Sequence, residues 1–217
     1  MIEAVVFDLD GVLLDSEHVW DAVREELARE RGGRWHDRAQ RDMMGMSSRE
    51  WAAYMHDVVG LREAPEEISA EVVRRLGTVY REELPLLPGA REAVERLAVR
   101  WPLGLASSSN REIIDLALEL AGLTGRFAAT VSSEEVERGK PAPDVYLEAA
   151  RLLDVVPERC AAVEDSSNGI QSAKAARMTV ITLPNPRYPP DDEALRGADR
   201  AIASLDELTP ELIDAAE

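Results

Sequence analysis

Residues 4–15 read AVVFDLDGVLLD, a short apolar run that ends in two aspartates before apolar residues resume. An apolar run without polar alternation is typical of a strand that is buried on both faces, as in a parallel sheet. Asp8 and Asp10 stand at i and i+2, so in an extended chain their side chains share one side, about 7 Å apart. Asp-Gly is also an ordinary turn signal, and a simple turn is the alternative interpretation. Two like charges beside buried residues make most sense with a cation between them.

Similar apolar runs recur along the chain, each closed by small, polar or acidic residues. The strand candidates are Ala4–Phe7, Leu103–Ala106, Ala128–Val131, Cys160–Val163, Thr179–Leu183 and Arg200–Ala203. Amphipathic stretches lie between the later runs, at Ala90–Arg100, Asn110–Ala121, Pro143–Leu153 and Ser167–Ala176. Strands that alternate with helices predict βαβ units, and therefore an α/β fold with a doubly wound, Rossmann-like parallel sheet.

One long segment, from about residue 16 to about residue 84, shows only helical patterns. Its signals are a periodic run of Val19, Val23 and Leu27, a capping box at Ser47–Glu50, and a proline at a helix start, Pro65. We therefore predict a small α-helical cap at 16–84, inserted into an α/β core that consists of 1–15 and 85–217. An insertion just after a first strand lies over the carboxyl end of the sheet, where open α/β folds bind ligands.

The composition excludes several classes of protein. The 217 residues include 42 acidic and 25 basic side chains, which give a formal net charge of −17. Nucleic acids and anionic membrane surfaces attract Lys and Arg, so this charge argues against both as partners. Hydrophobic residues make up 45 % of the chain, which excludes the composition of a disordered protein.

The compartment follows from two further features. The single cysteine, Cys160, cannot form an intrachain disulfide and suits a reducing environment. The apolar run near the start is far too short for a signal peptide or a membrane span. We therefore expect a cytoplasmic protein.

Three serines, Ser107, Ser108 and Ser109, follow the second strand candidate. We expect Ser109 to cap the next helix through its hydroxyl. One cap needs one hydroxyl, so the spare hydroxyls and the free backbone N–H groups at a helix start favour an anion site, with phosphate as the usual occupant.

Charged residues follow two later segments. Lys140 lies in a loop that two prolines stiffen, which favours a fixed positive charge, although a lysine in such a loop is more often solvated. Glu164 and Asp165 follow the fourth strand candidate, where they are also compatible with a helix start. Because neighbouring parallel strands end at one edge of a sheet, we expect this pair to converge with Asp8 and Asp10 as oxygen ligands for Mg²⁺.

Four motifs stand in order along nearly the whole chain: Phe7–Val12 with Asp15–Glu17, Leu105–Ser109, Gly139–Asp144, and Glu164–Ser166 with Gly169–Ile170. With these motifs the chain resembles the haloacid dehalogenase (HAD) superfamily of phosphohydrolases. The resemblance is to the subgroup with a helical cap inserted after the first strand. That subgroup includes phosphoglycolate phosphatase-like and β-phosphoglucomutase-like proteins.

The resemblance implies a chemical role for each motif. Asp8 would be the nucleophile that becomes an aspartyl-phosphate. Asp10 would protonate the leaving oxygen and then take a proton from the water that hydrolyses the intermediate. Ser107, Ser108 and Lys140 would hold the transferring phosphoryl group.

The cofactor that the resemblance implies is Mg²⁺. It would be held by Asp8, by the backbone carbonyl of Asp10 and by Asp165, with Glu164 in or next to the coordination shell. The substrate would be a small phosphorylated metabolite, such as a sugar phosphate or phosphoglycolate, and the reaction its hydrolysis. Arg49 is the cap residue expected to contact an anionic substrate, although a solvated arginine at a helix start is nearly as frequent.

Other activities are possible for the same architecture. A β-phosphoglucomutase-like mutase would carry a cap histidine a dozen residues after the nucleophile and a cap lysine for a second phosphate. Here Trp20 stands at the first position, His18 is two residues away, and Arg74 and Arg75 stand near the second, so a phosphatase is favoured. A dehalogenase is disfavoured because the carboxylates suit Mg²⁺-dependent phosphoryl chemistry. A non-catalytic HAD-like binding protein would lack the nucleophile or the acid. Both are present here, so this is the remote alternative.

Overall fold

The central strand of the sheet is β1 (Ala4–Phe7), which pairs in parallel with β2 (Leu103–Ser107) on one side and β4 (Cys160–Glu164) on the other. The computed structural model describes residues 1–216, and in them six strands form one sheet in the order β3-β2-β1-β4-β5-β6. The outer strands are β3 (Ala129–Ser132), β5 (Thr179–Thr182) and β6 (Arg200–Ala201), and they also pair in parallel. The strand order changes direction at β1, which is where open α/β sheets bind ligands.

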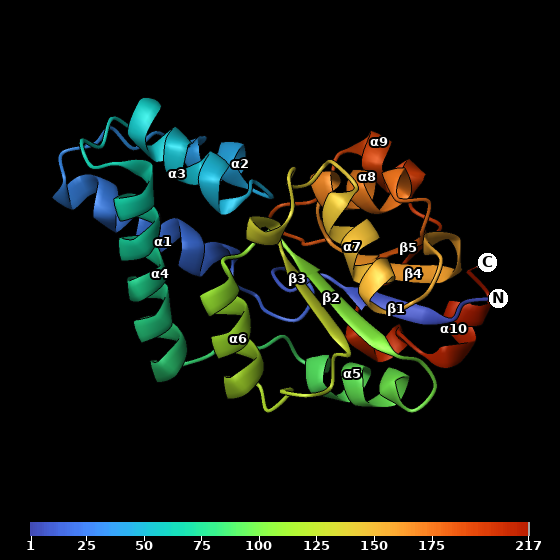
Figure 1. Cartoon of the computed structure of the whole chain (residues 1–217). Helices are drawn as coiled ribbons and strands as arrows, with labels where there is room; N and C mark the ends of the chain where they lie inside the picture. The colour runs from blue at the N-terminus through green and yellow to red at the C-terminus, as the bar shows by residue number, and fades with distance from the viewer. Residues whose placement is uncertain (217) are drawn as a thin grey trace.

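Helices cover both faces of this sheet (Figure 1). One face carries α7 (Asp144–Leu152), α8 (Ser167–Ala175) and α9 (Asp192–Gly197), and the other carries α5 (Ala90–Ala98), α6 (Arg111–Leu120) and α10 (Pro210–Asp214). Alternate residues of β1 serve the two layers: Val5 and Phe7 pack into one apolar cluster, and Ala4 and Val6 into the other. The predicted doubly wound α/β fold is confirmed.

The predicted strands agree with the observed ones to within one or two residues. The largest difference is at the last strand, predicted at Arg200–Ala203 and observed only at Arg200–Ala201. β6 is an edge strand of the sheet formed by residues 1–216, so it has a neighbouring strand on one side only. Both of its residues are exposed.

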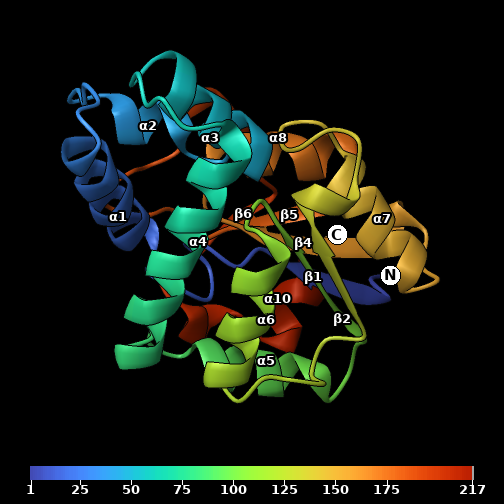
Figure 2. The same ribbon diagram turned by 60° about the vertical axis from the view of Figure 1, so that its left-hand side comes forward.

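Four helices come between β1 and β2 in the chain: α1 (Glu17–Glu30), α2 (Ala39–Met43), α3 (Ser48–Asp57) and α4 (Pro65–Glu82). Figures 1 and 2 show them together at the end of the molecule away from the two termini. The capping box is confirmed, because the Ser47 side chain accepts from the Glu50 backbone and the Glu50 carboxylate accepts from the Ser47 backbone. Pro65 is the first residue of α4, as predicted. The boundaries of the cap at 16–84 stay a prediction.

The buried stripe of α1 includes one charged residue. Its buried members are Val19, Trp20, Val23, Arg24, Leu27 and Ala28. Trp20 meets Trp51 of α3 edge to face, with 5.9 Å between the ring centroids. Arginine is rarely buried unless polar groups surround it, and the polar groups around this arginine belong to the site described below.

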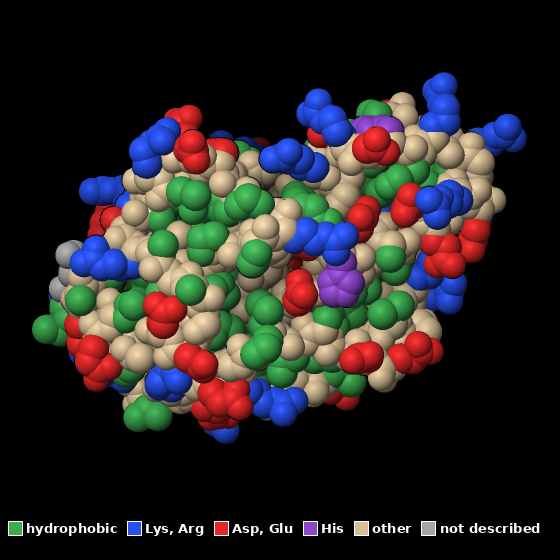
Figure 3. Space-filling model, turned by 180° about the vertical axis from the view of Figure 1, so that it is seen from behind, with side chains coloured by type: hydrophobic (Ala, Val, Ile, Leu, Met, Phe, Trp, Pro, Cys, Tyr) green, Lys and Arg blue, Asp and Glu red, His purple; other side chains and the backbone are tan. Residues whose placement is uncertain are grey.

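The surface carries acidic and basic side chains scattered among each other. Figure 3 shows this on the face opposite the view of Figure 1, with apolar side chains between the charges. None of the helices formed by residues 1–216 has the length and apolar character that crossing a bilayer requires.

Candidate active site

Three carboxylates meet at the carboxyl ends of β1 and β4. Asp8 follows β1, Glu164 ends β4 and Asp165 follows it, and these strands are neighbours in the sheet. One carboxylate oxygen from each lies within 4.8 Å of the other two. All three side chains are buried, with residue exposures of 6 %, 0 % and 2 %. The parallel register therefore brings these three predicted residues together.

Lys140 lies against this cluster from the loop before α7. Its Nζ lies 2.9 Å from Asp8 Oδ1 and 2.6 Å from Glu164 Oε1, and the residue is 3 % exposed. Burial opposes the charge of Lys140, but the carboxylates of Asp8 and Glu164 outweigh burial and raise its pKa above the ordinary value. The cation is therefore fixed beside the predicted nucleophile, whereas the solvated alternative is wrong.

Glu164 is the most completely hydrogen-bonded member of the cluster. Its Oε1 accepts from Lys140 Nζ at 2.6 Å and from the Tyr146 hydroxyl at 2.8 Å. Its Oε2 accepts from the backbone N–H of Asp165 at 3.0 Å, and from the backbone N–H and the hydroxyl of Ser166. A Cβ at Gly169 would lie 1.8 Å from Oε1, so a glycine is required there. These bonds make Glu164 an anchor for Lys140.

Asp8 and Asp165 are the members with free ligand atoms. Asp165 Oδ2 is buried without a hydrogen-bond partner, and it lies so close to the backbone that a Cβ at Gly11 would be 1.9 Å away. Burial raises the pKa of Asp8 to about 8, against the opposing effect of Lys140. Burial, Glu164 and Asp8 raise the pKa of Asp165 well above its ordinary value. Buried carboxylates this close together need a cation to ionise together, and hard oxygen donors fit a divalent ion.

The Asp10 side chain is not part of this group of ligand atoms, so its expected convergence with the other three carboxylates is wrong for its side chain. Its Oδ1 accepts from the Ser16 hydroxyl at 2.5 Å and from Trp20 Nε1 at 3.1 Å. Its Oδ2 accepts from the Ser109 hydroxyl at 2.6 Å. The chain leaves the extended conformation after Asp8, so the i, i+2 spacing no longer places the two carboxylates side by side.

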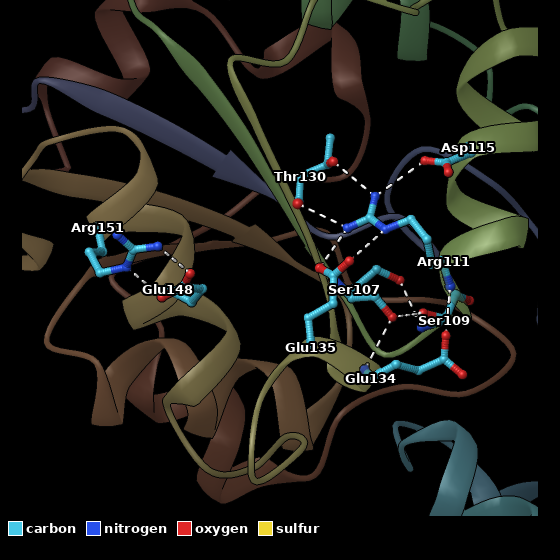
Figure 4. A network of polar contacts seen from close by, with 10 residues as sticks. Ser107, Ser109, Arg111, Asp115, Thr130, Glu134, Glu135, Glu148 and Arg151 are labelled. Carbon is cyan, nitrogen blue, oxygen red and sulfur yellow. Dashed lines mark hydrogen bonds and ion pairs between the residues drawn. The ribbon is translucent and has the colours of Figure 1, made fainter.

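The three serines after β2 have different partners. The predicted helix cap at Ser109 is wrong: the N-cap residue of α6 is Asn110, which makes no side-chain capping bond. The Glu134 carboxylate instead accepts the backbone N–H of Arg111 at 2.9 Å, and the Ser109 hydroxyl is free to bind Asp10. Ser107 is fully buried, and its Oγ accepts the backbone N–H of Ser109 at 3.0 Å (Figure 4).

Arg111 holds the short segment Ser133–Glu135 in place. Its guanidinium binds the carboxylates of Glu135 and Asp115 and both oxygens of Thr130 (Figure 4). Glu134 Oε1 also accepts from the Ser48 hydroxyl of α3 at 3.0 Å and from Asn110 Nδ2 at 2.8 Å. The core loop after β3 therefore binds both the start of α6 and the helices of residues 16–84.

A cavity opens above these groups, between the strand ends and the helices of residues 16–84. Asp8, Asp10, Ser108, Lys140 and Asp165 line it from the sheet side. The opposite wall includes Glu17, Trp20, Arg24, Met43, Met46 and Trp51. The Ser108 hydroxyl donates to the backbone carbonyl of Gly45 at 3.1 Å, which connects the two walls. The buried aspartates and the lysine thus share one space with polar and aromatic groups of the helices.

Some predicted residues lie elsewhere. Arg49 is exposed in the first turn of α3 and is not among the residues that line the cavity. The His18 side chain is 47 % exposed, and its nearest charged partner is Asp15 at 3.9 Å. Sequence analysis missed Glu17 and Arg24, although Arg24 stands four residues after Trp20 on the buried stripe of α1. That spacing was the available signal.

Comparisons with known proteins give a consistent family. A family model described as haloacid dehalogenase-like hydrolase matches residues 2–177. Hexitol phosphatase B of Escherichia coli (strain K12) is 35 % identical, with 96 % of this chain and 95 % of that protein covered. Phosphorylated carbohydrates phosphatase of Thermotoga maritima is 33 % identical, with coverages of 81 % and 82 %. The crystal structure of β-phosphoglucomutase from Clostridium difficile shares the fold with a TM-score of 0.86 at 24 % identity, and covers 100 % of this chain and 97 % of that one.

Proposed function

We propose that this chain, which belongs to the haloacid dehalogenase-like hydrolases, is a Mg²⁺-dependent phosphatase of small phosphorylated carbohydrates. Two relatives that are at least 33 % identical carry the names of phosphatases of hexitols and of phosphorylated carbohydrates. The observation that carries the proposal is the arrangement of Asp8, Lys140 and Asp165 at the end of β1 and β4.

Asp8 acts as the nucleophile in this proposal. One of its carboxylate oxygens forms a bond to the substrate phosphorus while the bond from phosphorus to the ester oxygen breaks, which leaves an aspartyl-phosphate. Lys140, 2.9 Å from Asp8 Oδ1, favours the ionised form of this carboxylate against the effect of burial and contributes positive charge for the phosphoryl oxygens. Asp8, Asp165 and the backbone carbonyl of Asp10 would hold Mg²⁺, which would supply positive charge to offset the repulsion between the anionic nucleophile and the anionic phosphate.

Asp10 moves the protons. It gives a proton to the leaving alkoxide oxygen, because an alkoxide of a sugar is a poor leaving group. It then takes a proton from water, whose oxygen bonds to phosphorus while the aspartyl–phosphorus bond breaks, and inorganic phosphate and free Asp8 result. Its three hydrogen bonds, from Ser16, Trp20 and Ser109, support this role because they hold its carboxylate toward the cavity.

The phosphoryl group binds to Ser107, Ser108 and Lys140 in this scheme. Ser108 and Lys140 line the cavity, and the Ser107 hydroxyl accepts a backbone N–H without donating to another of the described residues. In this scheme its proton would go to a phosphoryl oxygen, although Ser107 is fully buried and is not among the residues that line the cavity. Glu164 acts as the positioning residue for Lys140, and its Oε2 accepts the backbone N–H of Asp165, the residue that would bind the ion.

A phosphosugar mutase is the second candidate. The position of the cap histidine in that scheme is filled by Trp20, whose ring nitrogen donates to Asp10, and His18 does not line the cavity. Both observations favour water as the acceptor of the phosphoryl group.

Two assays test the proposal. We expect the protein to release phosphate from an aryl phosphate with Mg²⁺ and to lose this activity in excess chelator. Full activity in chelator would contradict the role of the ion. With β-glucose 1-phosphate and a bisphosphate primer we expect free phosphate to appear faster than glucose 6-phosphate, and the reverse order would identify a mutase.

A further inference from the structure

The guanidinium of Arg24 lies against two tryptophan rings in the wall of the cavity. The residue is 5 % exposed, and its Cζ lies 4.6 Å from the ring centroid of Trp20 and 4.6 Å from that of Trp51. Such cation–π contacts fix the plane of the guanidinium but occupy none of its N–H donors. Arg24 is therefore rigidly placed with its hydrogen-bonding capacity available.

The hydrogen bonds of Arg24 are incomplete. Among residues 1–216 its hydrogen-bond partner is Gln40, whose Oε1 lies 3.4 Å from Nη1, while Nε is buried without an acceptor. Burial lowers the pKa of Arg24 to about 10, so it remains charged at neutral pH. Leaving a buried charged donor unpaired is costly, and a bound ligand with acceptor atoms removes that cost.

Glu17 presents the complementary group on the same wall. Gln40 Nε2 donates to Glu17 Oε2 at 2.7 Å and to its backbone carbonyl at 3.2 Å, so Gln40 links Glu17 with Arg24. Within the described part of the chain, Glu17 and Arg24 form no ion pair with each other. An acceptor and a donor thus line the same cavity, linked through Gln40 and not by a direct ion pair.

We infer that Glu17 and Arg24 form a subsite for neighbouring hydroxyl groups of the leaving group, which makes the substrate a polyol or sugar monophosphate. One hydroxyl donates to the Glu17 carboxylate, and the adjacent hydroxyl oxygen accepts from Arg24. Trp20 and Trp51, whose rings hold Arg24 in place, line the same cavity. This inference rests on the proposed phosphatase activity.

The balance of charge indicates a neutral leaving group. A second phosphate at this subsite would meet Arg24 but also the carboxylates of Glu17 and Asp10, which line the same cavity. Burial and the nearby Asp10 raise the pKa of Glu17 to about 7, which reflects this crowding of negative charge. Hydroxyls satisfy both the donor and the acceptor without adding charge.

The test compares two esters in the same variants. A hexitol 6-phosphate carries hydroxyls that reach the subsite, and p-nitrophenyl phosphate carries none. We expect Arg24→Met and Glu17→Gln to lower the ratio of kcat/KM for the hexitol ester to kcat/KM for the aryl ester at least 10-fold, with Arg24→Lys between them and the wild type. Arg29→Met, the same change at an exposed arginine of the same helix, α1, is the matched control and should leave the ratio unchanged.

Two outcomes would overturn the subsite. An equal loss of kcat/KM on both esters assigns a merely structural role, and an unchanged ratio in Glu17→Gln and Arg24→Met removes the recognition of hydroxyls. If Arg24→Met does not fold, Glu17→Gln and Arg24→Lys decide. If the wild-type protein hydrolyses neither ester, the proposed phosphatase activity is refuted. Calorimetric binding of the hexitol ester to the wild type and to Glu17→Gln then tests the subsite alone.

Discussion

Lys140 and Arg24 are both buried cations that face one cavity, with exposures of 3 % and 5 %, but they are paired in opposite ways. Lys140 meets two carboxylates at 2.6 and 2.9 Å, and one of these carboxylates is itself held by four further donor contacts. Arg24 has a single 3.4 Å hydrogen bond to an amide and two aromatic rings. The first cation is fully paired within the protein, and the second keeps donor groups that the proposed subsite would use.

The difference follows from the elements that carry the two cations. The cluster around Lys140 sits at the ends of parallel strands, whose register fixes the carboxylates before any substrate binds. The groups around Arg24 sit on helices that follow one another in the chain, α1 to α3, and face the strand ends across the cavity. When the reacting groups lie on rigid strand ends and the recognition groups lie on inserted helices, the same reaction can serve many leaving groups.

The largest effect is expected from the strand ends themselves. Asp8→Asn removes the nucleophile, so turnover of any phosphate ester should fall by at least ~10³-fold, because the remaining groups cannot form the covalent intermediate. Steady-state assays with p-nitrophenyl phosphate measure this loss. Asp57→Asn, at an exposed aspartate that ends α3, is the control and should retain turnover. A similar rate in Asp8→Asn and the wild type would show that the covalent step lies elsewhere.

Lys140→Met tests whether the paired cation belongs to the reaction. It leaves Asp8 and Glu164 facing each other without a cation, so we expect turnover to fall by about 10²- to 10³-fold, the usual cost of losing one electrostatic contact to the transition state. Breaking a buried ion pair also costs about 3–5 kcal/mol of stability, which calorimetry would register as a lower Tm.

Lys174 provides the matched control for that substitution. It pairs with Asp199 at 2.9 Å, but its side chain is 38 % exposed, and exposed pairs contribute about 0–1 kcal/mol. Lys174→Met should therefore keep both turnover and Tm close to those of the wild type. Equal Tm losses in the two lysine variants would contradict the contrast between buried and exposed pairs.

Asp8 and Asp165 could be predicted because they stand where apolar runs stop, and Lys140 because two prolines stiffen its loop. Asp8, Lys140 and Asp165 follow from local sequence, and the parallel sheet then brings them together. The side-chain direction of Asp10 could not be predicted, since it depends on donors from Ser16 and Ser109, which lie in separate segments.

The helical wall was harder to predict from the sequence. Periodicity identifies the buried stripe of α1, but it does not say whether the stripe faces another helix or a cavity. The position of Arg49 at a helix start suggested substrate contact, yet its side chain is exposed, whereas Arg24 reaches the cavity from the middle of α1. Only the packing of α1 on α3 and over the strand ends distinguishes the two arginines.

The smallest effect concerns the stability of the helical wall. Burial and the nearby Asp10 raise the pKa of Glu17 from 4.5 to about 7 in the folded protein. Below pH 4.5 the carboxyl is neutral in both the folded and the unfolded chain, and its burial costs little. As the pH rises toward 7 the unfolded chain ionises Glu17 freely and the folded one does not, so the wild type loses stability.

Glu17→Gln keeps the shape of the side chain and removes this titration, so its Tm relative to the wild type should rise between pH 5 and pH 8. The pKa difference sets an upper limit of about 3 kcal/mol, which corresponds to several degrees. Calorimetry in chelator at pH 5 and at pH 8 measures the difference in Tm between Glu17→Gln and the wild type. Glu119→Gln, at an exposed position near the end of α6, is the control that should show no such rise. A Tm difference that is the same at both pH values would mean that Glu17 is already ionised in the folded protein and that Arg24 neutralises it. In that case the unpaired charge on the helical wall, and with it the contrast to Lys140, would not hold.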